Sequence, residues 1–140
     1  PEGIPTERAA AFGVSHATAF DALRLVADVQ HGERVAVLGA AGGVGLATVE
    51  LAALLGAEVV AVASTEEKRA VCAEQGAHVT LPYDDLKRSL RDAGGADVVI
   101  DPVGGPYAEE ALRAMSWGGR FVSVGFASGA LPEFGAMQPL

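Results

Sequence analysis

The sequence has few of the residues on which secreted, metal-binding and membrane proteins depend. Its single cysteine, Cys72, excludes an intrachain disulfide and a multi-cysteine zinc cluster. No apolar run approaches the ~20 residues that a membrane helix requires, and the N-terminus shows no basic-then-apolar leader. These absences predict a cytoplasmic protein without a membrane segment.

Basic residues are also scarce. The chain has 10 Lys and Arg residues against 18 acidic ones, which gives a formal net charge of −8. So acidic a surface disfavours broad nucleic-acid binding, although a nucleotide ligand needs only a local positive site. We expect no bound metal, because the histidines and the cysteine lack metal-ligand spacing: His16, His31, His78 and Cys72.

Glycine, in contrast, is abundant, and residues 39–45 (Gly-Ala-Ala-Gly-Gly-Val-Gly) are the most informative segment. An apolar run at 34–38 precedes them, and a stretch at 44–55 with apolar residues at helical spacing follows. In a strand–turn–helix unit, glycines let a pyrophosphate approach the backbone, and the helix start offers N–H groups and a positive dipole end. The segment therefore predicts a dinucleotide site, with Ala40 in the first slot of the usual G-x-G-x-x-G pattern and Gly45 in the last.

Strand-like and helix-like segments alternate along the chain. We predict strands at 34–38, 59–63, 79–81, 97–100 and 120–124. We predict a first helix around Phe20, Leu23 and Ala27 that ends near Gly32. Further helices are predicted at 44–55, at 64–75 with a capping box that begins at Ser64, at 84–93, and through 108–115. Helices between strands imply a parallel sheet. The expected fold is one doubly wound α/β domain over residues 1–140, with five strands in the order 3-2-1-4-5 and a sixth strand missing or incomplete.

In such a sheet the ligand lies across the carboxyl ends of the strands. Four loops fall at those ends, at 39–45, 64–65, 101–105 and 125–129. Asp101 is expected to fix its own loop by hydrogen bonds rather than to act as an acid or base. No serine stands in the G-x-S-x-G context of a hydrolase, so that chemistry is rejected.

The end of the second strand distinguishes NAD from NADP. An NAD site normally has an Asp or Glu there, whereas this chain has Ser64, and Lys68 follows one turn later. Glu66 and Glu67 weigh against a bound phosphate, although acids are also usual in the first turn of a helix. From spacing alone, Lys68 is equally well an ordinary surface lysine.

Several segments together resemble the medium-chain dehydrogenase/reductase superfamily, and specifically its zinc-independent quinone oxidoreductase branch. The resemblance covers nearly the whole chain and rests on residues 18–23 (TAFDAL), 32–35 (GERV), 39–45 (GAAGGVG), 55–57 (LGA), 101–105 (DPVGG), 118–120 (GGR) and 124–126 (VGF). It implies a Rossmann fold and NADPH as the cofactor.

The resemblance also assigns site residues. The 2′-phosphate would be held by Lys68 and Tyr83, with Ser64 beside them. The remaining cofactor-binding positions are Ala41, Gly42, Gly43 and Val44 in the glycine turn, Val103, Gly125, Phe126 and Ala127 along the nicotinamide, and Thr18 near its reacting end. No residue of the chain is assigned a catalytic role.

The implied activity is hydride transfer from NADPH to a quinone or an enone, by an enzyme expected to be a homodimer. In this family the substrate site lies between the cofactor domain and a GroES-like catalytic domain, which residues 1–140 do not contain. Two other interpretations stay open: a non-catalytic NADPH-binding module, and an enoyl-reductase segment of a larger synthase.

Overall fold

The computed structural model describes residues 3–135, and its centre is one sheet of five strands. The strands are all parallel and lie in the order β3-β2-β1-β4-β5: β1 (Arg34–Val37), β2 (Glu58–Val62), β3 (Val79–Leu81), β4 (Ala96–Asp101) and β5 (Met115–Ser123). The predicted fold class and strand order are confirmed. Residues 3–135 contain no sixth strand, and residues 136–140 lie outside the described part.

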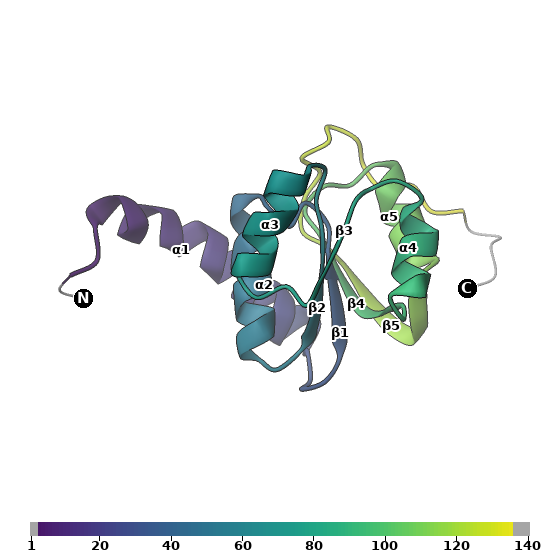
Figure 1. Ribbon diagram of the computed structural model, residues 1–140, viewed down its shortest axis with the longest axis horizontal. Coiled ribbons are helices and arrows are strands. Elements are labelled where there is room, and N and C mark those ends of the chain that lie inside the picture. The colour runs from purple at the N-terminus through teal and green to yellow at the C-terminus, as the bar shows by residue number, and fades with distance from the viewer. Residues whose placement is uncertain (1–2, 136–140) are drawn as a thin grey trace.

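Helices cover both faces of the sheet (Figure 1). One face carries α1 (Thr6–Phe20), the π-helix η1 (Asp21–Val26), α2 (Gly43–Leu54) and α3 (Glu66–Glu74). The other carries α4 (Leu86–Asp92) and α5 (Pro106–Leu112). The N-terminal half of α1 extends well beyond the edge of this three-layer body (Figure 1).

The strands fit between the two helix layers because their side chains alternate and both sets are apolar. In β1, Val35 and Val37 join the cluster under α2 and α3, whereas Ala36 joins the cluster under α4 and α5. The strand β2 divides in the same way, with Val59 in the first cluster and Val60 in the second. A sheet buried on both faces exposes only its edges and strand ends, so the loops at those ends are where a ligand can bind.

The start of α3 differs from the predicted capping box. The N-cap residue is Thr65 and not Ser64: Thr65 is still extended, with φ −118° and ψ 159°, and the helix begins at Glu66. The Thr65 hydroxyl accepts a hydrogen bond from the Lys68 backbone N–H at 3.3 Å. The shift by one residue leaves the Ser64 side chain outside the helix, and its hydroxyl is not used as a cap.

The boundary between α5 and β5 was also predicted wrongly. Met115 was expected on a helix face, but α5 ends at Leu112 and Met115 is the first residue of β5. Met115 pairs with Ala96 across the sheet, and an irregularity in the β4–β5 register follows it. Strand pairing therefore overrides the helical spacing of the side chains here.

The first helical segment was expected to end near Gly32, but it ends at Val26 in a wider turn. In η1 the Ala27 N–H bonds to the Ala22 carbonyl five residues back, at 2.9 Å. The extra residue in this turn changes which side chains of the helix face the core. Leu23 and Ala27 are buried as expected, but Phe20 is 52% exposed and Ala19 takes its place in the core.

The close backbone contact at Gly45 gives a stability prediction. A Cβ on Gly45 would lie 2.3 Å from the Gly39 carbonyl oxygen and 2.7 Å from the Ala40 Cα. Gly45→Ala is therefore expected to lower the free energy of unfolding in urea by about 1–3 kcal/mol, because the backbone must move apart. Gly13→Ala is the matched control, since nothing lies within 4 Å of its Cβ position in α1. It should raise stability by about 0.5–1 kcal/mol. Equal effects of the two changes would contradict this account.

Candidate functional site

The glycine turn between β1 and α2 is held by backbone contacts. Gly39 has a left-handed φ of +57°, and a Cβ there would lie 2.6 Å from a methyl group of Val103. The Gly42 N–H donates to the Gly39 carbonyl at 2.9 Å, and the Ala40 N–H donates to the Val62 carbonyl at 3.0 Å. The turn is thereby fixed to the ends of both β1 and β2.

The helix α2 starts directly from this turn. Its N-cap residue is Gly42, which has no side chain to cap the first N–H groups of the 12-residue helix. Those groups and the positive end of the helix dipole are the elements that bind a pyrophosphate. Gly45 allows this arrangement, because any larger residue would push α2 away from the turn.

A cavity of about 240 Å³ opens beside the turn. Its walls come from the carboxyl-terminal edge of the sheet, and the lining residues are Gly39, Ala41, Gly42, Ala63, Ser64, Lys68 and Tyr83. The structure thus brings together Ala41, Gly42, Ser64, Lys68 and Tyr83, all of which were predicted from the sequence. Among the described residues, Lys68 supplies the one charged group of the lining, and no carboxylate is part of it.

The lysine and the serine face one another across 3.5 Å, from Lys68 Nζ to Ser64 Oγ. Both side chains are exposed, so they are free to bind a ligand. The acids of the first turn of α3 lie elsewhere. The pKa of Glu67 is held below its usual value by its own backbone N–H and then by the Thr65 hydroxyl. Neither Glu66 nor Glu67 is among the residues that line the cavity.

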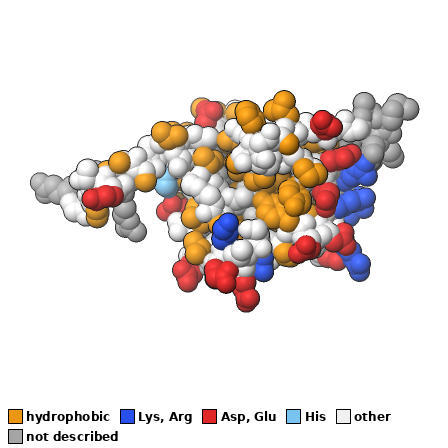
Figure 2. Space-filling model, turned by 90° about the horizontal axis from the view of Figure 1, so that it is seen from above, with side chains coloured by type: hydrophobic (Ala, Val, Ile, Leu, Met, Phe, Trp, Pro, Cys, Tyr) orange, Lys and Arg blue, Asp and Glu red, His pale blue; other side chains and the backbone are white. Residues whose placement is uncertain are grey.

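Acidic side chains also stay away from the middle of the face that Figure 2 shows. They lie around its margin, whereas hydrophobic side chains gather at its centre (Figure 2). Lys68 is the one charged residue among the described residues that line the cavity, so it sets the local charge there although the net charge of the chain is −8.

Tyr83 connects this cavity to the glycine turn. Its hydroxyl accepts a hydrogen bond from the Gly39 backbone N–H at 2.7 Å, so the hydroxyl proton remains available to a ligand. Burial raises the pKa of Tyr83 above its ordinary value of 10.0, and the Gly39 N–H opposes this shift. The ring lies against Tyr107, with centroids 4.3 Å apart.

The residues predicted to line the nicotinamide lie in two loops that bond to each other. The Ala127 N–H donates to the Pro102 carbonyl at 3.1 Å, and the Ser128 N–H donates to the Val103 carbonyl at 2.9 Å. Asp101 Oδ1 accepts from the backbone N–H of Val103, as expected of an acid that fixes its own loop. The predicted residues Val103, Gly125, Phe126 and Ala127 are thus neighbours at the ends of β4 and β5.

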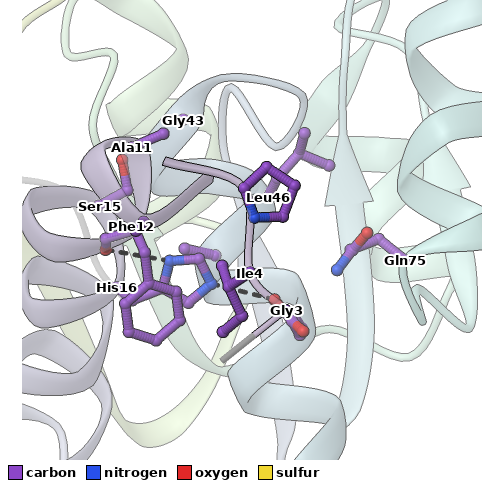
Figure 3. Close-up of a pocket in the computed structure, with 13 residues that line it drawn as sticks. Gly3, Ile4, Ala11, Phe12, Ser15, His16, Gly43, Leu46 and Gln75 are labelled. Atoms are coloured by element: carbon purple, nitrogen blue, oxygen red, sulfur yellow. Dashed lines mark hydrogen bonds and ion pairs between the residues drawn. The ribbon is translucent and has the colours of Figure 1, made fainter. Parts of the chain in front are cut away.

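Two other predicted residues, Gly43 and Val44, form the first turn of α2, whereas Thr18 lies near the end of α1. Neither Val44 nor Thr18 lines a cavity described here. Gly43 borders a second, larger cavity of about 850 Å³ between α1 and α2 (Figure 3). In it, His16 stacks on Phe12 with ring centroids 4.0 Å apart.

Sequence reasoning missed three contributors to the smaller cavity. Gly39 and Ala63 line it, and Arg69 supports it by donating from Nη1 to the Ala63 carbonyl at 3.1 Å. Gly39 could have been found, because it opens the glycine segment. Arg69 had no distinguishing signal, since nothing in the spacing separates it from the other basic residues of a helix surface.

No three His, Cys, Asp or Glu side chains within residues 3–135 are placed to hold a metal ion. Independence from zinc stays a prediction. Over the same residues, no helix combines the length and the apolar character that a membrane span requires.

The parallel sheet and its glycine turn define a Rossmann-like α/β protein. The chain belongs to the zinc-binding dehydrogenase family, whose family model matches residues 43–140. This membership confirms the resemblance seen in the sequence.

Individual relatives agree with the family. A quinone oxidoreductase-like protein 2 homolog from Nematostella vectensis is 39% identical over 142 residues, which cover 97% of this chain and 39% of that protein. A mycocerosic acid synthase-like polyketide synthase from Mycolicibacterium smegmatis is 35% identical over 130 residues, which cover 89% of this chain and 6% of that protein. The chain spans 39% of the length of the quinone oxidoreductase-like relatives it matches.

Among solved structures, the quinone oxidoreductase from Thermus thermophilus is similar over 94% of this chain and 44% of its own, with a TM-score of 0.85 and 40% identity. That protein was solved alone and in complex with NADPH, which is the cofactor predicted for the present chain.

The bond between Tyr83 and the glycine turn gives a pH prediction. A pKa raised by folding means that the folded state keeps the phenol proton longer than the unfolded chain does. The stabilisation by Tyr83 is therefore complete below about pH 10 and is lost as the pH rises above that value. Tyr83→Phe should lower the free energy of unfolding by about 1–3 kcal/mol at neutral pH, since the Gly39 N–H loses its acceptor. The difference in free energy of unfolding between the wild-type chain and Tyr83→Phe, measured by urea titration, should become smaller above about pH 10.

Tyr107→Phe is the control for this measurement, because Tyr107 contacts the Tyr83 ring but does not accept from Gly39. The stability of Tyr107→Phe should still fall at high pH, as that of the wild-type chain does. The account would be refuted if the difference in free energy of unfolding between wild type and Tyr83→Phe stayed constant from about pH 7 to about pH 11.

Proposed function

We propose that this chain binds NADPH across the carboxyl ends of its strands, as the cofactor domain of an oxidoreductase. The 2′-phosphate would occupy the cavity of about 240 Å³, and the pyrophosphate would lie on the start of α2. Hydride would pass from NADPH to a quinone or an enone.

One observation carries this proposal. Ser64, Lys68 and Tyr83 converge on a cavity that touches the glycine turn and has no carboxylate among the described residues of its lining. An NAD site places an acid at the end of β2 to bind the ribose hydroxyls, and that acid would repel a phosphate. The donors present here suit a dianion: an ammonium group, a serine hydroxyl and a phenol proton.

The residues of the chain supply binding and orientation. Lys68 would neutralise the phosphate, and the N–H groups of Gly43 and Val44 would face the pyrophosphate. The loops with Val103 and Phe126 would place the nicotinamide and exclude water from one side of it. When bound, the cofactor supplies the hydride. No side chain of this chain is proposed as an acid or base.

The relatives support the same activity through their names as quinone oxidoreductases. Because the chain spans 39% of the first relative's length, we propose that substrate binding needs a second domain of GroES-like fold. A homodimer, a zinc-free mechanism and a cytoplasmic location complete the proposal. The single buried cysteine is compatible with that location.

A second function has its own supporting observation. The polyketide synthase from Mycolicibacterium smegmatis matches 89% of this chain. The chain would then be part of an enoyl reductase that reduces the double bond of a thioester. The cofactor site would be the same, so only the substrate distinguishes the two functions. A binding module without turnover is the third alternative.

The cofactor site predicts a preference that calorimetry can measure. NADPH should bind more tightly than NADH, and Lys68→Ala should remove about 1–3 kcal/mol of NADPH binding while leaving NADH affinity nearly unchanged. The reason is that Lys68 would contact only the 2′-phosphate.

The matched control is Lys87→Ala, since Lys87 is the chain's other lysine and does not line the cavity. It should leave both affinities unchanged. Equal binding of NADPH and NADH by the wild-type chain would overturn the 2′-phosphate assignment.

The activity is tested on the longest natural protein that contains this chain. Its consumption of NADPH should be followed with 1,2-naphthoquinone, with a simple enone and with crotonyl-coenzyme A. Turnover of the quinone or the enone supports the first function, whereas turnover of the thioester alone favours the enoyl reductase. If the protein binds NADPH but turns over none of these substrates, the non-catalytic binding module is the function that remains.

A further inference from the structure

Asp101, the last residue of β4, is a buried acid that the cofactor contacts proposed above do not use. It has no exposed surface, although acids are rarely buried without a charged partner. Its Oδ1 atom accepts hydrogen bonds from two successive backbone groups, the Val103 N–H at 2.8 Å and the Gly104 N–H at 2.9 Å. One carboxylate oxygen therefore sets the path of the loop that follows β4.

The backbone of the same residue holds the neighbouring loop. The Asp101 carbonyl accepts from the Val124 N–H at 2.8 Å and from the Gly125 N–H at 3.3 Å. Both bonds cross from the end of β4 to the end of β5. Asp101 thus bonds to both loops, with its side chain to one and its carbonyl to the other.

The two loops are in close contact. A Cβ on Gly104 would lie 2.6 Å from the Ala130 carbonyl oxygen, and one on Gly125 would lie 3.3 Å from the Pro102 carbonyl oxygen. The first loop also touches the glycine turn, because Val103 occupies the space that a side chain on Gly39 would need. A shift at Asp101 would therefore reach three loops of the candidate site.

The second oxygen of the carboxylate, Oδ2, is buried without a hydrogen-bond partner among the described residues. Such a group reduces stability, since its lost hydration is not replaced. Among the described residues, the contacts that fix the carboxylate are therefore the two N–H groups on Oδ1.

We propose that Asp101 is a positioning residue for the nicotinamide end of the cofactor. Its Oδ1 atom holds Val103 and Gly104 in place, and through them it fixes the surface against which the nicotinamide ring would lie. This inference rests on the proposed binding of NADPH. It adds that the reactive end of the cofactor depends on a residue that never touches it.

The test separates the two ends of the cofactor with two probes. NADPH contains the nicotinamide, whereas adenosine 2′,5′-bisphosphate contains only the phosphate end. For Asp101→Ala in the full chain, the NADPH dissociation constant should rise about tenfold, and the fluorescence of bound nicotinamide should return toward that of free NADPH. The dissociation constant of the bisphosphate should stay within about twofold of wild type.

Two further variants make the result specific. Asp101→Asn keeps an oxygen that can accept both N–H groups and removes the charge, so it should restore NADPH binding and fluorescence. Asp97→Ala is the matched control at the opposite end of β4, where Asp97 Oδ2 accepts from the Arg34 N–H at 2.8 Å. It should lower stability without changing either ligand's affinity.

A measurement on the wild-type chain covers the case in which Asp101→Ala does not fold. The amide protons of Val103 and Gly104 should be protected from hydrogen exchange before any ligand is added. Rapid exchange there, equal weakening of both ligands by a folded Asp101→Ala, or failure of Asp101→Asn to restore binding would each overturn the inference. If the wild-type chain binds neither probe, the proposed function itself fails, and the two failures are thereby distinguished.

Discussion

The close approach of α2 to the turn before it governs the geometry of the whole site. Gly45 lies so near Gly39 and Ala40 that the helix start and the turn form one rigid unit. The turn is also bonded to β2 and touches the loop after β4. Each group that could bind a cofactor is therefore placed relative to this single contact. The small residues around it are a condition for function as well as for packing.

Hydrogen bonds then connect loops that are distant in sequence. Tyr83 reaches back 44 residues to Gly39, and Asp101 links the ends of β4 and β5. The parallel sheet makes these links possible, because it gathers every strand's carboxyl end at one edge. Backbone groups and single polar side chains hold these loops together, and Asp101 is the one charged residue that is buried among the described residues.

The fold and most of the smaller cavity could be predicted, because they follow from patterns with a direct physical cause. Apolar runs and glycine turns identified every strand, and the lining residues Ser64, Lys68 and Tyr83 meet in space. The failures concern competition between local patterns. Ser64 and Thr65 can each cap the helix, and spacing does not show which of them keeps the extended backbone of an N-cap residue, as Thr65 does. Met115 fits a helix face, but its pairing partner Ala96 lies on another strand and is invisible to spacing.

The Tyr83 hydrogen bond also limits how the cofactor preference of this fold can evolve. The tyrosine serves the turn and the predicted phosphate site with one hydroxyl, so a substitution there would alter anchoring and selectivity together. Ser64 and Lys68 have exposed side chains, and the contact between them supports no other described part of the structure. With the 2′-phosphate bound as proposed, mutational paths toward a different dinucleotide would therefore be open at 64 and 68 and obstructed at 83. Selection would then change the cofactor preference through the start of α3 while the turn stays unchanged.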